Sequence, residues 1–395
     1  MRRSTPGLFV IAAATSILAA CGSPGTASTP TPTPTATLPV PTPTPSPTAT
    51  PPVCTNVTAL ASWSLTQLAE QTLVVPVEES DVAAVTAEIA AGAGGVILFG
   101  STAPSNLAAS LHTLSAAGPD GIAPFVMTDE EGGAVQRMAN LVGSLPSART
   151  MAQTMSAAQI RSLVTTVALR MHASGVTMDL APVLDLDDGV GPNNSDPDGT
   201  RSFSLNPQLT TADGIAFMQG LEAGGIIPVV KHFPGLGQAS ANTDVAPATT
   251  QPWSDLQKAG LLPFESAIAA GVPVVMVANA TVPGLATLPA SISSEVMTTV
   301  LGDELGFHGL VITDSLSAGA LADIGYSVPR AVVAAIAAGA DMVLYTATAS
   351  QVAALTQSTA AAIVAAVTAG TLDRGRLVSA VASILATKKV DLCSS

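Results

Sequence analysis

A lysine and a histidine stand side by side at the end of an apolar run. Val229 and Val230 lead into Lys231 and His232, and Pro234 then breaks the strand pattern before a segment of glycines and small polar residues. We expect the end of a buried strand that delivers an ammonium group and an imidazole into a pocket. The alternative is a strand end with a solvated lysine and a histidine in the core.

Two further segments place carboxylates directly after apolar runs. Asp129 opens the sequence Asp-Glu-Glu-Gly-Gly-Ala-Val-Gln-Arg, which ends at Arg137, and Asp314 follows the run 309–313 in a Thr-Asp-x-x-Ser pattern. Carboxylates so placed can act as nucleophiles or acids, and an aspartate near an arginine can share the binding of a polar ligand. The alternatives are a loop salt bridge for Asp129 with Arg137, and a helix N-cap for Asp314.

Short apolar runs alternate along the chain with longer, alanine-rich stretches of helical pattern. Eight such runs predict an α/β fold, a single (β/α)8 TIM barrel, with an open doubly wound sheet as the alternative. The expected strands are 73–77, 95–99, 124–128, 177–182, 226–231, 274–278, 309–313 and 341–345. The expected helices include 82–91, 106–116, 160–173, 212–223, 254–270, 294–305 and 330–338. The polar groups described above follow strands, at the barrel face where such folds place their chemistry.

Taken in order, these segments resemble the family 3 glycoside hydrolases, and most closely the bacterial single-domain β-N-acetylglucosaminidases (β-N-acetylhexosaminidases). The motifs that carry the resemblance are 129–137, Ala-Pro-Val-Leu-Asp at 181–185, Arg-Ser-Phe at 201–203, Lys-His-Phe-Pro-Gly at 231–235 and Gly-Leu-Val-Ile-Thr-Asp at 309–314. The resemblance implies a retaining exo-glycosidase that removes terminal β-linked N-acetylglucosamine from peptidoglycan-derived saccharides. It implies no cofactor and no metal.

The resemblance also assigns roles to individual residues. Asp314 matches the catalytic nucleophile, which would form a covalent glycosyl-enzyme. The residues that match the sugar-holding side chains of the family are Asp129, Arg137, Arg201, Lys231 and His232. An aspartate can accept bonds from two neighbouring hydroxyls, and arginine and lysine supply donors.

The sequence departs from this family at the general acid/base. Relatives carry Asp-x-His in the loop after the Lys-His pair, whereas this chain has Asn-Thr-Asp at 242–244, and Leu236 and Gln238 stand where relatives have His and Asp. A free aspartate titrates near 3.9, so about one in a thousand is protonated at pH 7, a penalty of roughly 4 kcal/mol. Two carboxylates are nevertheless the usual pair in glycosidases. Asp244 is therefore the predicted acid/base, and the alternative function is a non-catalytic, sugar-binding lipoprotein.

The N-terminal region has the organisation of an exported lipoprotein. Residues 1–21 combine a basic start, an apolar run and a Leu-Ala-Ala-Cys box whose Cys21 would carry the lipid; an ordinary signal peptide is the alternative. Residues 22–53 are rich in Pro and Thr, which predicts a disordered, extended linker. Residues 54–395 would then form the catalytic domain, outside the cytoplasm, anchored to the cell membrane through Cys21 and working within the cell wall.

The remaining cysteines fit an oxidising compartment. With Cys21 lipidated, Cys54 and Cys393 stand at the two ends of the domain, either as a disulfide or as two unpaired thiols.

The charge of the chain argues against nucleic acid as a ligand, and one acidic loop does not fit calcium. The formal net charge is −14 and the mature part has no basic run, so nucleic acid is not an expected partner. Residues 194–199 mimic the start of a calcium loop, but the twelfth position is Leu205 where glutamate is needed. This loop is therefore expected to lead only to Arg201.

Overall fold

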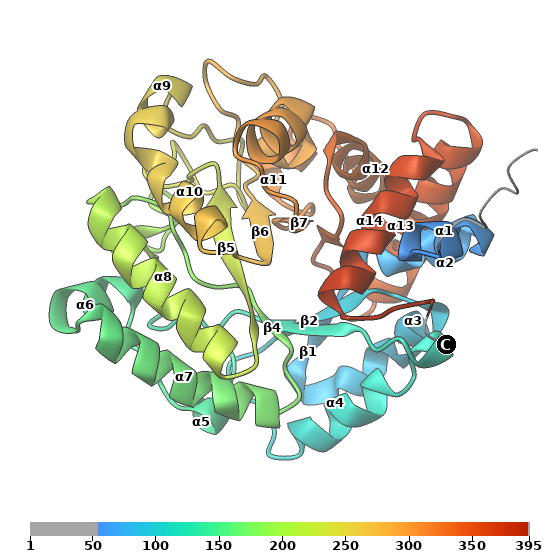
Figure 1. Ribbon diagram of the computed structural model, residues 1–395, viewed down its shortest axis with the longest axis horizontal. Coiled ribbons are helices and arrows are strands. Elements are labelled where there is room, and N and C mark those ends of the chain that lie inside the picture. The colour runs from blue at the N-terminus through green and yellow to red at the C-terminus, as the bar shows by residue number, and fades with distance from the viewer. Residues whose placement is uncertain (1–53, 394–395) are drawn as a thin grey trace, which may run out of the picture. The chain divides into compact units, whose positions relative to one another are not determined.

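Eight parallel strands form one sheet that closes into a barrel (Figure 1). The computed structural model describes residues 54–393, so the predicted signal peptide 1–21 with Cys21 and the predicted linker 22–53 lie outside the described residues. The strands are β1 Leu73–Glu78, β2 Gly95–Phe99, β3 Phe125–Thr128, β4 Met178–Asp179, β5 Ile227–Phe233, β6 Val274–Val277, β7 Leu310–Thr313 and β8 Val343–Leu344.

The pairing of the strands closes the sheet on itself. Neighbouring strands pair in chain order from β1 to β7, and β8 pairs with β1. A parallel bridge then joins Ile312 of β7 to Met342, which directly precedes β8. The predicted (β/α)8 barrel is confirmed. The open doubly wound sheet is wrong, because the two ends of the strand order are joined to each other instead of standing as free edges.

Apolar side chains fill the inside of the barrel. They come from alternating strand positions, because successive side chains point to opposite faces of a sheet. The buried residues of this cluster include Val74, Ile97, Met127, Val229 and Ile312. The interior is thus a packed core and not a channel, so the polar groups that follow the strands gather at one mouth of the barrel.

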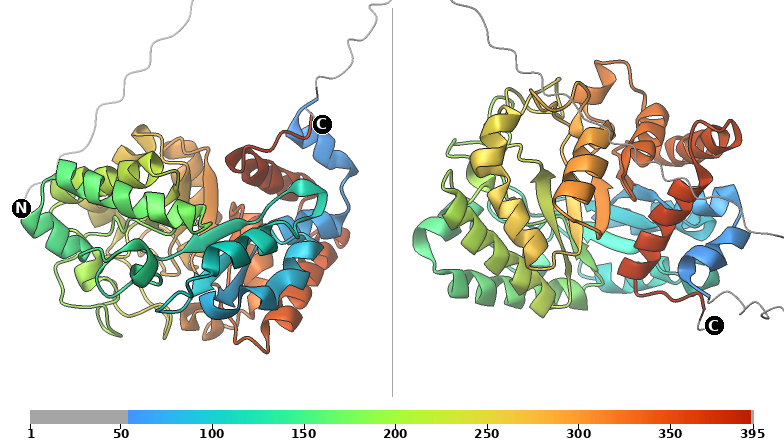
Figure 2. Two further views of the ribbon diagram at one scale, coloured as in Figure 1. Left: turned by 90° about the horizontal axis from the view of Figure 1, so that it is seen from below. Right: turned by 45° about the horizontal axis from the view of Figure 1, so that its top comes forward.

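Helices surround the strands on the outside (Figures 1 and 2). The longer ones are α2 Leu65–Gln71, α3 Thr86–Ala91, α4 Leu107–Ser115, α6 Ala148–Thr154, α7 Ala157–Ala173, α8 Pro207–Ala223, α10 Leu262–Ala269, α12 Val328–Ala338, α13 Val352–Thr368 and α14 Arg374–Thr387. The short ones are α1 Asn56–Ala59, α5 Ala139–Val142, α9 Trp253–Asp255 and α11 Gly319–Ala322. The 3-10 and π segments are η1 Leu60–Ser62, η2 Glu79–Val85, η3 Pro119–Gly121, η4 Gly199–Arg201, η5 Leu256–Gly260, η6 Ala290–Ile292 and η7 Glu295–Glu304. Within residues 54–393, none of these helices combines the length and the apolar character needed to cross a bilayer.

Some elements differ from the sequence-based expectation in extent. The single helix expected over 254–270 is divided into α9, the π turn η5 and α10, with Pro263 in the first turn of α10. Proline has no backbone N–H and its ring clashes with the preceding turn, so a new helix begins there. The strand expected over 177–182 is shorter, since β4 spans Met178–Asp179, and Pro182, which cannot donate a bond to the sheet, lies beyond its end.

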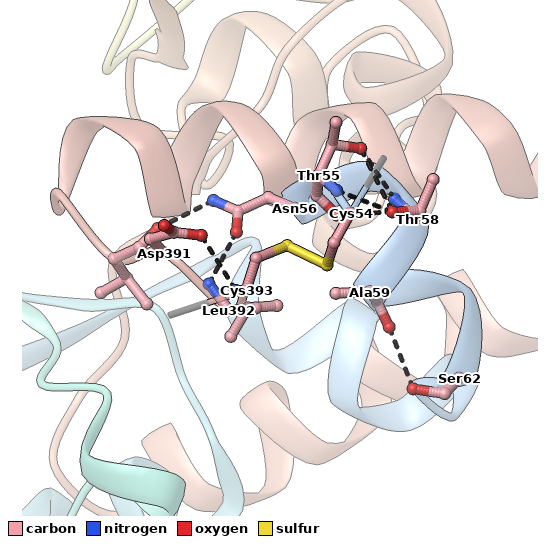
Figure 3. Close-up of a disulfide and its surroundings, with 10 residues drawn as sticks. Cys54, Thr55, Asn56, Thr58, Ala59, Ser62, Asp391, Leu392 and Cys393 are labelled. Carbon is pink, nitrogen blue, oxygen red and sulfur yellow. Dashed lines mark hydrogen bonds between the residues drawn. A yellow bond between two sulfur atoms is a disulfide. The ribbon is translucent and has the colours of Figure 1, made fainter. Parts of the chain in front are cut away.

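A disulfide joins the two ends of the described chain (Figure 3). Cys54 precedes α1 and Cys393 follows α14, and their Cα atoms lie 5.9 Å apart. The side chain of Asn56 braces the same junction: its Nδ2 donates to the carbonyl of Val390 at 2.8 Å, and its Oδ1 accepts the N–H of Leu392 at 2.9 Å. The segment after α14 is therefore tied to the start of the domain by a covalent bond and by two hydrogen bonds.

Glu70 of α2 is a buried acid that makes the stability of the fold depend on pH. It is 7% exposed, and its Oε2 has no hydrogen-bond partner among the described residues. Burial, and then the charge of Glu88, raises its pKa from 4.5 to about 7. Ionisation of Glu70 in the folded protein therefore costs stability. The cost is absent below about pH 4.5, grows as the pH rises to about 7, and is complete above about pH 7. We expect Glu70→Gln to raise the free energy of unfolding by about 2 kcal/mol at about pH 8 and to leave it unchanged at about pH 4.

Urea denaturation of both proteins at the two pH values measures this difference. Glu304→Gln is the matched control, because Glu304 is exposed and its replacement should leave stability unchanged at either pH. An equal gain for Glu70→Gln at both pH values would show that packing, and not ionisation, is responsible.

Candidate active site

The carboxyl ends of the strands surround a cavity of about 430 Å³. Its walls include the residues predicted to react with or hold a sugar: Asp129, Arg137, Arg201, Lys231, His232, Asp244 and Asp314. Lys231 and His232 lie near the carboxyl end of β5, and the others follow β3 and β7 or lie in the long segments after β4 and β5. The fold therefore brings the whole predicted set to one place.

A buried glutamate shapes the loop after β3. Glu130 is fully buried, and its Oε1 accepts the backbone N–H groups of Arg137 and Met138 at 2.6 and 2.7 Å. These bonds fold the segment back toward the strand end. As a result Asp129 and Glu131, on either side of Glu130, both line the cavity together with Arg137.

Three cations and two carboxylates form a network in the wall of the cavity. Nζ of Lys231 lies 3.0 Å from Oδ1 of Asp129 and 2.6 Å from Oε1 of Glu131. Arg201 binds the same glutamate with Nε at 2.7 Å and Nη2 at 2.8 Å. Arg137 pairs with Asp129 at 3.4 Å, so the loop salt bridge considered for these two residues exists and also lines the cavity. Lys231 is 2% exposed, so the alternative of a solvated lysine is wrong.

Burial and charge pairing oppose each other in this network. Burial lowers the pKa of Lys231, but Glu131 and Asp129 outweigh it and raise the pKa. Burial raises the pKa of Glu131, but Arg201 and Lys231 hold it well below the usual range. The pKa of Asp129 is also lowered, because Lys231 and Arg137 outweigh its burial. The network is therefore charged at neutral pH and offers fixed donors and acceptors to a ligand rich in hydroxyl groups.

His232 is held as a neutral imidazole. It is 4% exposed, and its Nδ1 lies 2.6 Å from Oδ2 of Asp185. Burial, and then the charge of Arg201, lowers its pKa to about 4. Asp185 also accepts the backbone N–H groups of Leu236, at 2.6 Å, and of His232 itself. When the Nδ1 proton points at Asp185, Nε2 is left as an acceptor for a hydroxyl group in the cavity.

Asp314 stands at the carboxyl end of β7 and is fixed there by its backbone. Its N–H donates to the carbonyl of Val277 on β6 at 3.0 Å, and its Oδ1 accepts the N–H of Ser315 at 2.6 Å. The helix that follows, α11, has a different N-cap, so the N-cap alternative for Asp314 is wrong. Burial raises the pKa of Asp314; His232 opposes this shift and the charge of Asp244 adds to it.

The loop after β5 carries Asp244 to the cavity and is held on two sides. On one side, the N–H of Asn242 donates to the carbonyl of Asn194, in the loop after β4, at 3.1 Å. On the other, the N–H of Gly319 donates to the carbonyl of Asp244 at 3.0 Å, and a Cβ at Gly319 would collide with the carbonyl of Val245. The side chain of Asp244 is exposed and has no ion-pair partner within residues 54–393. Its backbone is therefore fixed while its carboxyl group is open to the cavity.

Three buried groups beside the cavity are of the types that bind metals. Asp185, Asp198 and His232 bring one oxygen or nitrogen atom each within 4.8 Å of one another. Protein donors already meet two of them, since Asp185 accepts backbone N–H groups and Asp198 lies 3.4 Å from Arg201. Asp196, in the calcium-like segment, instead accepts a glycine N–H of its own loop at 2.6 Å. The acidic residues of that segment thus face different protein partners. Asp185 supports His232, whereas Oδ2 of Asp198 is buried without a hydrogen-bond partner among the described residues.

The predicted set of site residues omitted Glu131, Asp185 and Asp198. Glu131 binds two cations of the site, and Asp185 fixes the orientation of the imidazole. Both lie within the sequence motifs, and Asp185 follows a strand as the other polar groups do, so position relative to the strands was a signal for them. Asp198 had no such signal beyond its nearness to Arg201 in sequence.

Glu131 is expected to stabilise the fold as well as the site. Glu131→Gln removes the charge that Lys231 and Arg201 share and leaves two buried cations with less compensation. We expect the free energy of unfolding at neutral pH to fall by about 3–5 kcal/mol, as measured by chemical denaturation. Because its folded-state pKa is lowered, this contribution is complete above the unfolded value of 4.5 and is lost as the pH falls below it.

The matched control is Asp255→Asn, which breaks an ion pair with Lys258 whose side chains are 51% and 73% exposed. An exposed pair contributes about 0–1 kcal/mol, so this variant should unfold nearly as the parent protein does. Equal stability of the two variants would contradict a stabilising role for Glu131.

Comparisons with known proteins bear on the family of the chain. The model of the Glycosyl hydrolase family 3 N terminal domain matches residues 66–387. The chain is 36% identical over 266 residues to Beta-hexosaminidase LpqI of Mycobacterium tuberculosis, a match that covers 65% of this chain and 66% of that protein, just under two thirds of its length. It is 34% identical over 263 residues to Beta-hexosaminidase of Nitrosomonas eutropha, covering 64% of this chain and 73% of that protein.

Solved structures give the same picture. The structure of M. tuberculosis LpqI has a TM-score of 0.76 and 32% sequence identity, and the superposition covers 85% of this chain and 96% of that one. Beta-N-acetylhexosaminidase from Beutenbergia cavernae has a TM-score of 0.75 and 30% identity, covering 84% of this chain and all of that one (100%).

Proposed function

Since the chain matches the N-terminal domain of glycosyl hydrolase family 3 and so belongs to that family, we propose that it is a retaining exo-glycosidase that removes terminal β-linked N-acetylglucosamine. The observation that carries this proposal is the position of Asp314 and Asp244 in one cavity, where the charge of one raises the pKa of the other. Two carboxyl groups on one pocket suit the cleavage of a glycosidic bond through a covalent intermediate.

The charged network holds the sugar in this proposal. Asp129 accepts bonds from neighbouring hydroxyls, and Lys231, Arg137 and Arg201 donate to the sugar oxygens. Nε2 of His232 accepts a further hydroxyl proton. Because the two carboxylates and three cations of this network are already ion-paired, they need little rearrangement when the sugar binds, which favours a fixed orientation of the anomeric carbon.

The reaction proceeds in two steps. In the first, a carboxylate oxygen of Asp314 attacks the anomeric carbon while Asp244 gives a proton to the glycosidic oxygen, so the leaving group departs as an alcohol and a glycosyl ester forms on Asp314. In the second, the Asp244 carboxylate takes a proton from water as the water oxygen attacks the anomeric carbon. The ester bond breaks, Asp314 regains its charge and the sugar is released.

The setting proposed for this reaction is the outside of the cell membrane. The box ending at Cys21 and the Pro/Thr-rich stretch support a lipid anchor followed by a tether. The Cys54–Cys393 disulfide supports an oxidising compartment. Fragments of peptidoglycan that end in N-acetylglucosamine are the substrates that we propose in this place.

A non-catalytic sugar-binding lipoprotein is the second candidate. It is favoured by the exposed position of Asp244, whose carboxyl group is not held by an ion pair within residues 54–393 as the groups around Lys231 are. In that case the network around Lys231 would bind saccharides without turning them over.

An assay of the purified domain on a nitrophenyl β-N-acetylglucosaminide, from about pH 4 to about pH 8, tests the proposal. We expect release of nitrophenol, and calorimetry should show binding of N-acetylglucosamine. A folded protein that is inactive over the whole range contradicts the glycosidase proposal. If that protein still binds the sugar, the non-catalytic function takes its place.

A further inference from the structure

A second cavity, of about 1070 Å³, opens at the amino ends of the strands. Phe125 begins β3, Ile227 begins β5 and Gly309 directly precedes β7, and all three residues line it. The candidate active site lies at the carboxyl ends of the same strands, so the two cavities occupy opposite mouths of the barrel. The proposed glycosidase reaction uses no residue of this second cavity.

Two of the four lysines of the chain line this cavity. Lys388 and Lys389 stand there with the imidazoles of His172 and His308, in a chain with a net charge of −14. Among the residues that line it, Glu222 is the one acid. This mouth of the barrel therefore favours an anion, although the protein as a whole is strongly acidic.

Lys388 lines this cavity, and within residues 54–393 no carboxylate pairs with its ammonium group. Its Nζ lies 5.1 Å from the centre of the Phe125 ring and 3.4 Å from Oε1 of Gln71, and both of these groups are neutral. Burial lowers the pKa of this ammonium group to about 7. An anion bound in the cavity would supply the missing counter-charge and favour the protonated form.

The rest of the lining is mostly apolar. The apolar residues that contribute to it include Pro124, Phe125, Ile226, Pro228, Pro273 and Val390. Such a surface would leave a small, fully hydrated anion without contacts on most sides. It fits a ligand in which a charged head is joined to an apolar body.

The wall beside Lys388 is built into the fold. Val390 lines the cavity, and its carbonyl accepts Nδ2 of Asn56 at 2.8 Å. Three residues further on, Cys393 is bonded to Cys54 (Figure 3). The segment after α14 is therefore tied down on the side where Lys388 enters the cavity, which keeps the ammonium group in place before any ligand arrives.

We propose that this cavity binds an amphiphilic phosphate monoester, with Lys388 pairing with the phosphate and the apolar lining covering the chain. A phosphate monoester carries between one and two negative charges at neutral pH, which suits a site lined by two lysines. The same chemistry occurs in a free alkyl phosphate and in the headgroup of an anionic lipid.

Calorimetry on the folded domain with its disulfide intact tests the proposal. Hexyl phosphate is expected to bind, whereas hexanol and hexylammonium, which keep the chain and change the head, are expected to bind far more weakly or not at all. Lys388→Met keeps the apolar stem of the side chain and removes the charge, and should weaken hexyl phosphate binding roughly tenfold. Lys258→Met, which removes an exposed lysine elsewhere, should leave it unchanged.

Equal binding of hexanol and hexyl phosphate to the parent protein overturns the proposal, and this comparison needs no variant to fold. Equal binding of hexyl phosphate by the parent and by folded Lys388→Met overturns it as well. Vesicles of phosphatidylcholine with and without phosphatidic acid distinguish a lipid headgroup from a free alkyl phosphate as the ligand. Binding that requires phosphatidic acid and is lost in Lys388→Met assigns the site to a lipid headgroup, and binding of hexyl phosphate without vesicle binding assigns it to a free ligand.

Discussion

Replacement of Asp314 by asparagine is expected to abolish hydrolysis of aryl β-N-acetylglucosaminides. An amide has nearly the shape of the carboxylate but cannot attack the anomeric carbon, so no glycosyl-enzyme can form. The loss of kcat should be on the order of 10⁴-fold or more, as for other enzymes that lose their nucleophile. Binding of N-acetylglucosamine should survive, because Asp129, Lys231 and Arg201 do not depend on Asp314 for their contacts with one another.

Initial rates and calorimetry on the same preparation separate these two effects. Asp303→Asn is the matched control, since Asp303 is an exposed carboxylate in η7 that does not line the cavity, and its loss should leave kcat unchanged. A slow fluorinated sugar substrate should also leave a covalent adduct on the peptide that contains Asp314. Full activity of Asp314→Asn, or an adduct on another peptide, would place the nucleophile elsewhere.

Replacement of Asp244 by asparagine is expected to slow hydrolysis to an extent that depends on the leaving group. For a poor leaving group such as a sugar or methanol, loss of the proton donor should lower kcat/KM by about 10²–10⁴-fold. For dinitrophenol, which departs without a proton, the first step should be nearly unchanged. The second step then lacks its base, and azide, which needs none, should restore turnover by forming a glycosyl azide.

The pH profile gives a second measure of the same variant. Burial raises the pKa of Asp314, His232 opposes that shift, and the charge of Asp244 raises the pKa further. Asp314 must be ionised to attack, so a raised pKa moves the acid side of the profile to higher pH. Asp244→Asn removes one of the raising charges and should move that side to lower pH.

Asp188→Asn is the control for this experiment, because Asp188 is an exposed aspartate in the loop after β4. This variant should keep the parent protein's ratio of rates on good and poor leaving groups. The acid side of its pH profile should also stay where it is in the parent protein. If Asp244→Asn lowers the rates on good and poor leaving groups by the same factor, Asp244 acts in positioning and another group serves as the acid.

The sequence predicted more of the barrel than of the contacts at its mouth. Strands and helices follow from periodicities of two and 3.6 residues, which a short window of sequence contains. The helix expected over 254–270 is divided, although Pro263 was a visible signal for it. The alternatives for Lys231 and for Asp314 were open at that stage, because the burial of a strand end depends on the loops that cover it.

The stretch around Lys231 illustrates what the sequence predicts and what only the tertiary structure decides. By itself the sequence determined that a lysine and a histidine stand at the end of an apolar strand, and its motifs predicted which residues would gather there. Only the tertiary structure decided that Glu131 is the partner of both Lys231 and Arg201, across 100 and 70 positions of the chain. It also decided that Asp185 orients His232, that burial and the charge of Arg201 keep this imidazole neutral, and that Asp244 stays exposed.

The physical reason is the separation along the chain over which each kind of interaction acts. Hydrophobic period and turn chemistry act between near neighbours, so they can be read along the chain. Burial, ion pairing and the pKa values that they set depend on groups that meet only when the barrel closes. For the same reason the cationic cavity around Lys388 had no signal in sequence: Gln71, Phe125 and Lys388 are far apart until the strands and α14 bring them together.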